Sequence, residues 1–99
     1  MSERHYVYLL KPVHIPLDDI MTPALDQAQT DHFNRLKVML AEGRLVLAGP
    51  CEDEAFGVVI FSAESRDEAE RIMNDDPAVK AGLMTAELHP FCVSLVKGE

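Results

Sequence analysis

The stretch AFGVVIFSAESRDEAERIMNDDP, residues 55–77, joins a strand pattern directly to a helix pattern. Its first part, 55–63, is a run of aromatic and branched apolar residues, which favours a β-strand. Its second part, 65–76, begins with Ser65 and has Glu68 three residues later, which is the capping-box pattern of a helix start. The apolar residues of that helix share one stripe: Ala69, Ile72 and Met73. The stretch therefore predicts a strand followed by an amphipathic helix.

The predicted strand at 55–63 carries apolar side chains on both of its faces, because successive side chains of a strand alternate between faces. The two sets are Phe56, Val58 and Ile60 on one face, and Val59 and Phe61 on the other. The apolar run at 91–96 also lacks alternation. A sheet with helices on one face and water on the other should alternate, so we expect the second face to pack against another sheet. The simplest source is a second copy of the chain, and we predict a homodimer.

Proline, glycine and capping residues mark the ends of the remaining elements. The expected order is a strand at 4–13, a loop at 14–21, a long helix at 22–43, a strand at 44–51, the strand at 55–63, the helix at 65–76, a further turn at 77–83 and a last strand at 84–97 that Pro90 interrupts or bends. The long helix has Thr22 as its expected N-cap, Pro23 in its first position and Gly43 as its stop. This order predicts a single domain, 1–99, of the α+β class: a ferredoxin-like βαββαβ fold with two helices on one face of an antiparallel sheet.

Composition and charge restrict the partners of this domain. The chain has 47% hydrophobic and 26% charged residues, the balance of a folded domain rather than of a disordered segment. Its formal net charge of −8 disfavours nucleic acid and anionic membrane surfaces as partners. No apolar run is long enough to cross a bilayer and the start of the chain lacks signal-peptide order, so a cytoplasmic protein is expected. Cys51 and Cys92 form no disulfide or metal motif and are expected to be buried thiols.

A histidine lies inside the apolar stripe of the long helix. On a helical wheel with about 100° per residue, the stripe consists of Leu25, Ala28, Phe33, Leu36, Met39 and Leu40. His32 and Gln29 fall within it, whereas Asp31 and Arg35 are expected nearer to solvent. A histidine that faces a sheet either completes a buried hydrogen bond or lines a cavity, and the pattern alone favours the hydrogen bond. A catalytic role requires a carboxylate that holds one ring nitrogen.

Two acids before a proline, at the end of the second helix, are the candidate partners of His32. A residue before proline is pushed out of helical geometry, so Asp76 is expected to cap the turn that begins at Pro77. This capping role explains the acid without any catalysis. Asp75 is expected to face solvent. In a ferredoxin-like fold both helices cover the same face of the sheet, so the end of the second helix, with Asp76, can approach the first.

Four motifs follow one another along the chain in a specific order. They are the histidine in DHFNRLKVMLAEGRLVLAGP at 31–50, the Gly49-Pro50 pair that closes the next strand, DPAVKAGL at 76–83 and the proline in HPF at 89–91. Together they resemble the YCII-related (YciI-like) family of the dimeric α+β barrel proteins. The resemblance implies two ferredoxin-like units with facing sheets, and an active site around a His and Asp pair, here His32 and Asp76. The loop KPVHIPLDDIMTP at 11–23 departs from the family pattern.

The resemblance also implies a small-molecule enzyme that works without a cofactor, because some relatives are associated with cofactor-free elimination in the breakdown of chlorinated aromatics. His32 would act as general base and acid, removing a proton next to a carbonyl or from a phenolic hydroxyl, and Asp76 would orient and charge it. The enzyme that the resemblance implies is a lyase or isomerase, or is dehydrochlorinase-like, and acts on small organic substrates, which include aromatic compounds. No metal site is expected, since His5, His14 and His89 lack zinc-ligand spacing.

Four further residues are candidates for substrate binding. Arg35 could hold an anionic group, although a solvated helix charge is its more common role. His14, in the 11–23 loop, could reach the pocket mouth, and Gly49 and Pro50 would end a strand beside the site. The alternative function is a non-catalytic ligand-binding or accessory protein on the same dimeric barrel, with a structural His–Asp pair. A cofactor-free oxygenase is a third candidate, which the sequence does not separate from the first.

Overall fold

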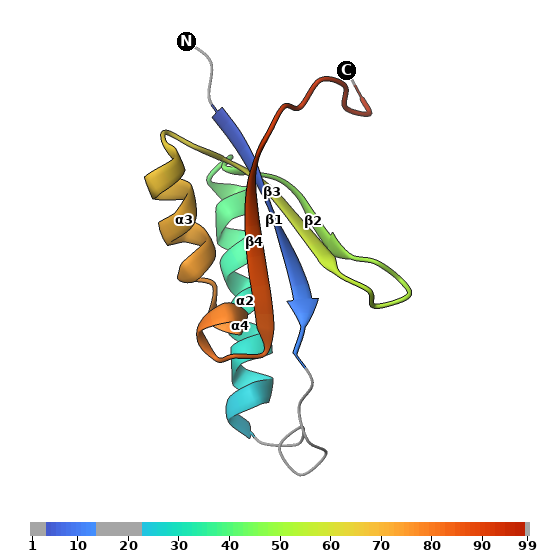
Figure 1. Cartoon of the computed structure of the whole chain (residues 1–99), viewed down its shortest axis with the longest axis vertical. Helices are drawn as coiled ribbons and strands as arrows, with labels where there is room; N and C mark the ends of the chain where they lie inside the picture. Colours follow the sequence, from blue (N-terminus) through green and yellow to red (C-terminus); the bar gives the residue numbers. More distant parts are fainter. Residues whose placement is uncertain (1–3, 14–22, 99) are drawn as a thin grey trace.

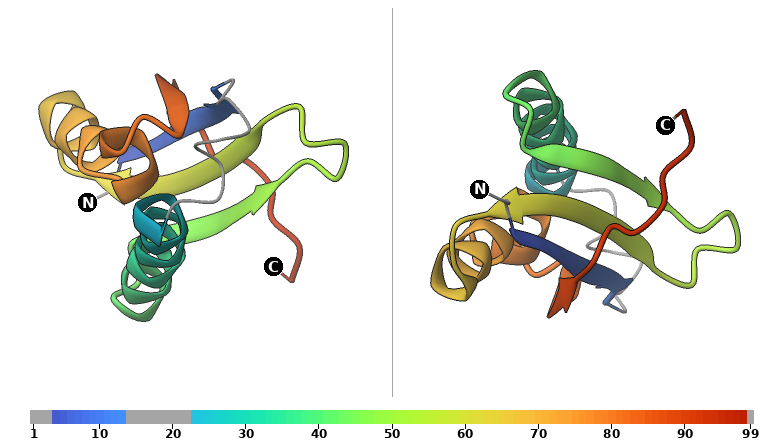
Figure 2. Two further views of the ribbon diagram at one scale, coloured as in Figure 1. Left: turned by 90° about the horizontal axis from the view of Figure 1, so that it is seen from below. Right: turned by 90° about the horizontal axis from the view of Figure 1, so that it is seen from above.

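The computed structural model describes residues 4–13 and 23–98. The elements, in order, are β1 (Arg4–Pro12), α2 (Pro23–Ala41), β2 (Leu45–Pro50), β3 (Gly57–Ala63), α3 (Arg66–Asn74), α4 (Pro77–Lys80) and β4 (Met84–Phe91). The strands form one antiparallel sheet in the order β2-β3-β1-β4, and the helices lie on one side of it (Figures 1 and 2). The predicted ferredoxin-like order is confirmed, with α4 as the further turn. The loop predicted at 14–21 lies outside the described residues.

The central strand β1 supplies the side chains around which the core is built. Its alternation directs Tyr6, Tyr8 and Leu10 to the helix-covered face, where all three are buried. Phe61 of β3 packs against both tyrosines, with ring centroids 6.2 Å from that of Tyr6 and 5.6 Å from that of Tyr8. Tyr8 is fully buried, so its hydroxyl needs a hydrogen-bond partner within the protein.

Helix α2 packs along a narrower stripe than the wheel predicts. Ala28, Leu36 and Met39 are buried as expected, but Phe33 and Leu40 are each 59% exposed. The expectation for these two is wrong because α2 lies over the edge strand β2 and against α4, so the flank that carries them borders an open groove instead of the sheet. The side chain of Leu25, the remaining member of the predicted stripe, lies outside the described part.

The residues predicted to cap the second helix and the turn after it are found as caps in the structure. The side-chain oxygen of Ser65 accepts a hydrogen bond from the backbone N–H of Glu68 at 3.1 Å, at the start of α3. Asp75 is the C-cap of α3 and is exposed. Asp76 is the N-cap of α4, and its side chain accepts a hydrogen bond from the backbone N–H of Ala78. The chain therefore turns sharply between α3 and α4, with the Asp76 side chain directed inward.

The last strand is shorter than predicted, since β4 ends at Phe91 and not near residue 97. Its register gives the reason: Phe91 lies opposite His5, and β1 begins only one residue earlier, at Arg4. Strand pairing therefore stops there. Cys92 follows the strand and is exposed, and Cys51 follows β2 and is half-buried. The prediction of two buried thiols is wrong because both residues lie just beyond strand ends.

The sheet face away from the helices carries apolar side chains over β1, β2 and β3, as the sequence predicts, whereas β4 adds Glu87 and His89 to it. Val7 and Ile60 lie opposite each other on this face and are almost buried, whereas Leu47 on β2 and Phe91 on β4 are exposed. These side chains form a surface that a second sheet could cover. The homodimer stays a prediction, because the structure contains a single chain.

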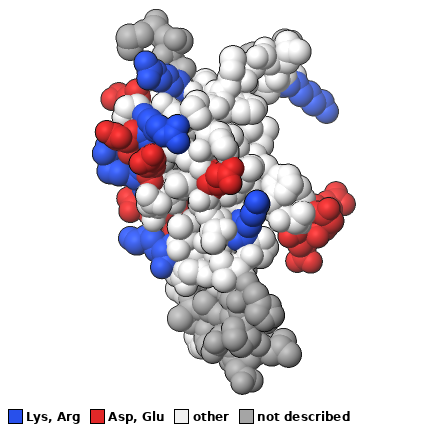
Figure 3. Space-filling view, in the orientation of Figure 1, with Lys and Arg blue, Asp and Glu red and all other residues white. Residues whose placement is uncertain are grey.

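Charged side chains of both signs are mixed over the visible surface (Figure 3). Acidic side chains gather at the tip of the β2–β3 loop, where the sequence reads CEDEA at 51–55. The face in view has no continuous basic area of the kind that binds a phosphate backbone. Within 4–13 and 23–98, no helix is both long and apolar enough to span a membrane.

We expect Ser65→Ala to lower the free energy of unfolding by about 1 kcal/mol, because it removes the N-cap acceptor of α3. Urea unfolding followed by circular dichroism measures the effect. Ser65→Asp is the matched control, since aspartate can accept the same hydrogen bond and should keep wild-type stability. Equal stabilities of the Ala and Asp variants would contradict the capping role.

Candidate active site

His32 and Asp76 are 44 residues apart in the sequence and in direct contact in the structure. His32 projects from α2, and Asp76 lies between α3 and α4. The Nδ1 atom of His32 is 2.7 Å from Oδ1 and 2.8 Å from Oδ2 of Asp76. The contact that the resemblance implies is therefore formed where the end of the second helix meets the first.

The carboxylate of Asp76 is buried, with 0% of the residue exposed, but it is well supplied with donors. The Tyr8 hydroxyl donates to Oδ2 at 2.6 Å and the Ala78 backbone N–H donates to Oδ1 at 2.9 Å, in addition to the His32 contact. Burial by itself raises the pKa of Asp76, but the hydrogen bonds from His32 and then Tyr8 outweigh it, so the pKa lies below its ordinary value. Asp76 is ionised at neutral pH.

This ionised partner determines which ring nitrogen of His32 carries the proton. A carboxylate only accepts hydrogen bonds, so Nδ1 of His32 must donate. In the neutral ring, Nε2 is then left with a free lone pair. The His32 side chain is 18% exposed, so the ring is not sealed off by its contact with Asp76. Nε2 is the atom that can take up a proton from outside.

Tyr8 is a residue of this site that the sequence reasoning missed. Burial, and then the negative charge of Asp76, raises the pKa of Tyr8 far above its ordinary value, so the phenol is a permanent donor. One signal was present, since alternation in β1 places Tyr8 on the face shared with Tyr6 and Leu10, and a buried tyrosine hydroxyl needs a partner. That partner is 68 residues away, which no local pattern reveals.

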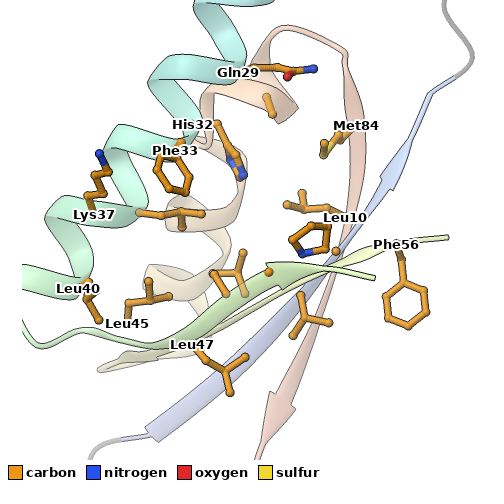
Figure 4. A pocket seen from close by; sticks show the side chains of 18 of the residues that line it. Leu10, Gln29, His32, Phe33, Lys37, Leu40, Leu45, Leu47, Phe56 and Met84 are labelled. Carbon is orange, nitrogen blue, oxygen red and sulfur yellow. The ribbon is translucent and has the colours of Figure 1, made fainter. Parts of the chain in front are cut away.

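His32 lines an open groove of about 800 Å³ between α2 and the β2–β3 hairpin, and its ring points from α2 toward the sheet (Figure 4). Most of the lining is apolar and includes Leu10, Leu36, Leu40, Leu45, Ala48, Val59 and Met84. The polar lining residues include Gln29, His32, Lys37 and Glu54. Asp76 does not line the groove, because it lies behind His32. A groove of this size and lining suits a small, mostly apolar molecule.

The other predicted site residues lie in different places. Gly49 and Pro50, at the end of β2, line the groove. Arg35 does not line it, and the expectation that it lies near solvent is wrong: the residue is half-buried, and its Nη1 atom is buried without a hydrogen-bond partner among the described residues. Its charge acts on the buried Tyr8, so Arg35 lies near the core and not at the groove. His14 lies outside the described residues.

Lys37 is the basic residue that α2 contributes to the groove. Its Nζ atom lies 5.0 Å from the centroid of the Phe33 ring, within cation–π range. Lys37 is exposed, and it reaches the groove because that flank of α2 is open. An anionic group in the groove would therefore meet Lys37 and not Arg35.

Potential metal ligands are scattered through the part of the chain that the structure describes. No three of its His, Cys, Asp or Glu side chains are placed to hold a metal ion together. His89 contacts Glu87 on the exposed face of β4. The acid–base groups gathered at the groove are His32 and, behind it, Asp76 and Tyr8.

The fold and the site define a class of protein, a ferredoxin-like α+β domain with a histidine–aspartate pair beside an apolar groove. The chain belongs to the YCII-related domain family, whose profile matches residues 6–91, so the family expected from the motifs is confirmed. Its structure is similar to that of 5-chloro-2-hydroxyhydroquinone dehydrochlorinase from Burkholderia phenoliruptrix AC1100 in complex with 2,5-dihydroxybenzoquinone. The TM-score is 0.54 at 20% identity, over 87% of this chain and 93% of that chain, which shows a shared fold. No curated protein matches the sequence.

We expect acid to destabilise the protein through Asp76. Its pKa is lower in the folded protein than in the unfolded chain, so its ionisation stabilises the fold above the unfolded value of about 4, and this contribution is lost as the pH falls through the folded value. Asp76→Asn should remove this dependence and lower the free energy of unfolding at neutral pH by on the order of 3 kcal/mol, because buried donors lose a charged acceptor. Urea unfolding at a series of pH values measures both effects.

Asp75→Asn is the matched control, since Asp75 is the neighbouring acid and is exposed. It should keep the acid sensitivity of the wild type. If Asp76→Asn loses stability on acidification as steeply as Asp75→Asn does, Asp76 is not the source of that sensitivity.

Proposed function

We propose that this protein is a cofactor-free enzyme for a small organic substrate, a lyase or isomerase of the dehydrochlorinase kind, with His32 as its general acid–base group. One observation carries the proposal: Nδ1 of His32 is held by a buried, ionised carboxylate while the side chain lines an apolar groove. An imidazole held in this way can accept and return protons near neutral pH. Asp76 keeps the ring in one tautomer and stabilises the imidazolium that forms.

The proposed reaction begins when Nε2 of His32 removes the proton of a hydroxyl group on an electron-rich ring. The imidazolium returns this proton to the ring carbon that carries a halide, which gives a keto tautomer. Loss of a second hydroxyl proton to His32 then lets the halide leave with the electrons of its carbon bond, and a quinone forms. The sum is the loss of one hydrogen halide, so no electron acceptor is consumed. Without a leaving group, the first two steps alone are an isomerisation.

The groove supports a ring compound as substrate. Its apolar lining favours a flat hydrocarbon framework over a highly charged molecule. The fold likeness to a dehydrochlorinase whose structure holds 2,5-dihydroxybenzoquinone supports a hydroxylated ring. We propose that Gly49 and Pro50 contact the ring, and that Lys37 takes the anion-binding role expected of Arg35.

A non-catalytic ligand-binding role is the alternative, and one observation favours it. Asp76 joins three elements through Tyr8, His32 and Ala78, which is sufficient reason to retain a buried acid without any turnover. On this alternative the groove binds a ligand, and the His–Asp pair is structural.

Substitution of His32 distinguishes the two functions. With a chlorinated trihydroxybenzene as substrate, His32→Asn should lower kcat by about 100-fold or more, because it removes the general base. Release of chloride and the absorbance of the quinone measure the rate. Asp75→Asn is the control, since Asp75 is exposed and does not line the groove, and it should keep the wild-type rate. Saturable binding to the wild type with no turnover of any hydroxylated haloarene would favour the ligand-binding alternative.

We also propose that two copies pair through the sheet faces that the helices leave uncovered. Phe91→Glu places a charge on that face, and we expect it to convert the dimer into a monomer in sedimentation equilibrium. Val38→Glu adds the same charge at an exposed apolar position of α2 and should leave the dimer intact. A wild-type protein that sediments as a monomer contradicts this pairing.

A further inference from the structure

The Tyr8 hydroxyl donates a hydrogen bond to the same Asp76 carboxylate that holds Nδ1 of His32. We propose that Tyr8 is a positioning residue that, by donating a hydrogen bond to Asp76, weakens the attraction between this carboxylate and a protonated His32. The inference rests on the proposed function of His32 as acid–base group and adds to it the residue that adjusts its basicity. Tyr8 is not one of the residues that line the groove, so its effect on the reaction is indirect.

The geometry makes Tyr8 and His32 share one oxygen atom. Oδ2 of Asp76 accepts from the Tyr8 hydroxyl at 2.6 Å and lies 2.8 Å from Nδ1 of His32. Oδ1 lies 2.7 Å from the same Nδ1 and accepts from the Ala78 N–H at 2.9 Å. Each hydrogen bond donated to the carboxylate reduces the negative charge that its oxygens present to the imidazole ring. Tyr8 therefore weakens the pull of Asp76 on a protonated His32.

This weakening favours catalysis by a base. An imidazolium is stabilised by the negative charge beside its Nδ1–H, so a fully concentrated charge on Asp76 would keep His32 protonated at higher pH. Because Tyr8 donates to the same carboxylate, Asp76 stabilises the imidazolium less than it would without this hydroxyl, which favours the form with a free lone pair on Nε2. Burial, and then the charge of Asp76, keeps the pKa of Tyr8 far above its ordinary value, so the donor is present throughout the neutral range.

Other charged groups near the pair act without a hydrogen bond to Asp76. Arg35 on α2 acts on Tyr8 through its charge alone, and it opposes the rise in the pKa of Tyr8. Lys37 on α2 and Glu54 in the β2–β3 loop line the same groove as His32. Among the described residues, the side-chain donors to Asp76 are Tyr8 and His32. Removing the Tyr8 hydroxyl is therefore a clean change of the carboxylate's environment.

The test is Tyr8→Phe, with Tyr6→Phe as matched control. Tyr6 is buried on the same face of β1, packs on the same Phe61 ring and makes no side-chain hydrogen bond within the described part. NMR titration of the His32 ring should show its midpoint moved upward in Tyr8→Phe by about half a pH unit or more, where one unit corresponds to about 1.4 kcal/mol between protonation states. The acid limb of kcat/KM should move in the same direction. Tyr6→Phe should match the wild type in both.

Equal His32 midpoints in Tyr8→Phe and Tyr6→Phe overturn the inference, whether or not the protein turns over substrate. An upward shift in proteins that show no turnover supports the inference and overturns the proposed function, so the two failures are distinguishable. If Tyr8→Phe does not fold, the wild type carries the test through the Tyr8 hydroxyl proton, observed by NMR. A hydroxyl proton that exchanges slowly with water supports the inference, and one that exchanges freely overturns it, because the hydrogen bond to Asp76 is then absent.

Discussion

A buried carboxylate needs hydrogen-bond donors from the protein in place of water. At Asp76 these donors join the sheet to the helices. Its donors come from the central strand β1, from the long helix α2 and from the first turn of α4. Strand β1 is held in the middle of the sheet, so α2 and α4 must pack where their donors can reach Asp76. The packing of the helix layer and the tautomer of His32 thus have the same cause.

Local chemistry made much of the fold predictable. Ser65 and Asp76 act on the backbone within three residues, so their capping roles can be read from neighbours in the sequence. The dense apolar run at 55–63 predicts a buried strand. The end of β4 is different, because it depends on where β1 begins, and that partner lies more than eighty residues away in the chain.

The site was predictable in part. His32 faces inward on a helical wheel, and the acid before Pro77 is held in one geometry, so a family resemblance was enough to pair them. The places of Tyr8, Lys37 and Arg35 could not be predicted, because they depend on how α2 lies over the edge of the sheet. A wheel gives angles around one helix but not the direction from which the sheet approaches, and a modest rotation exchanges the residues that border a groove with those that point away from it.

The wall of the groove that faces α2 and the acid–base pair are built from different parts of the chain. Tyr8, Asp76 and the turn into α4 support His32 from behind, whereas β2 and β3 and the loop between them form the opposite wall. Substitutions in that hairpin can reshape the cavity while the buried carboxylate and its donors stay as they are. Such a division lets related chains diverge in the molecules they accept while they inherit one unchanged proton-handling unit, and it makes the hairpin the natural place to redesign specificity.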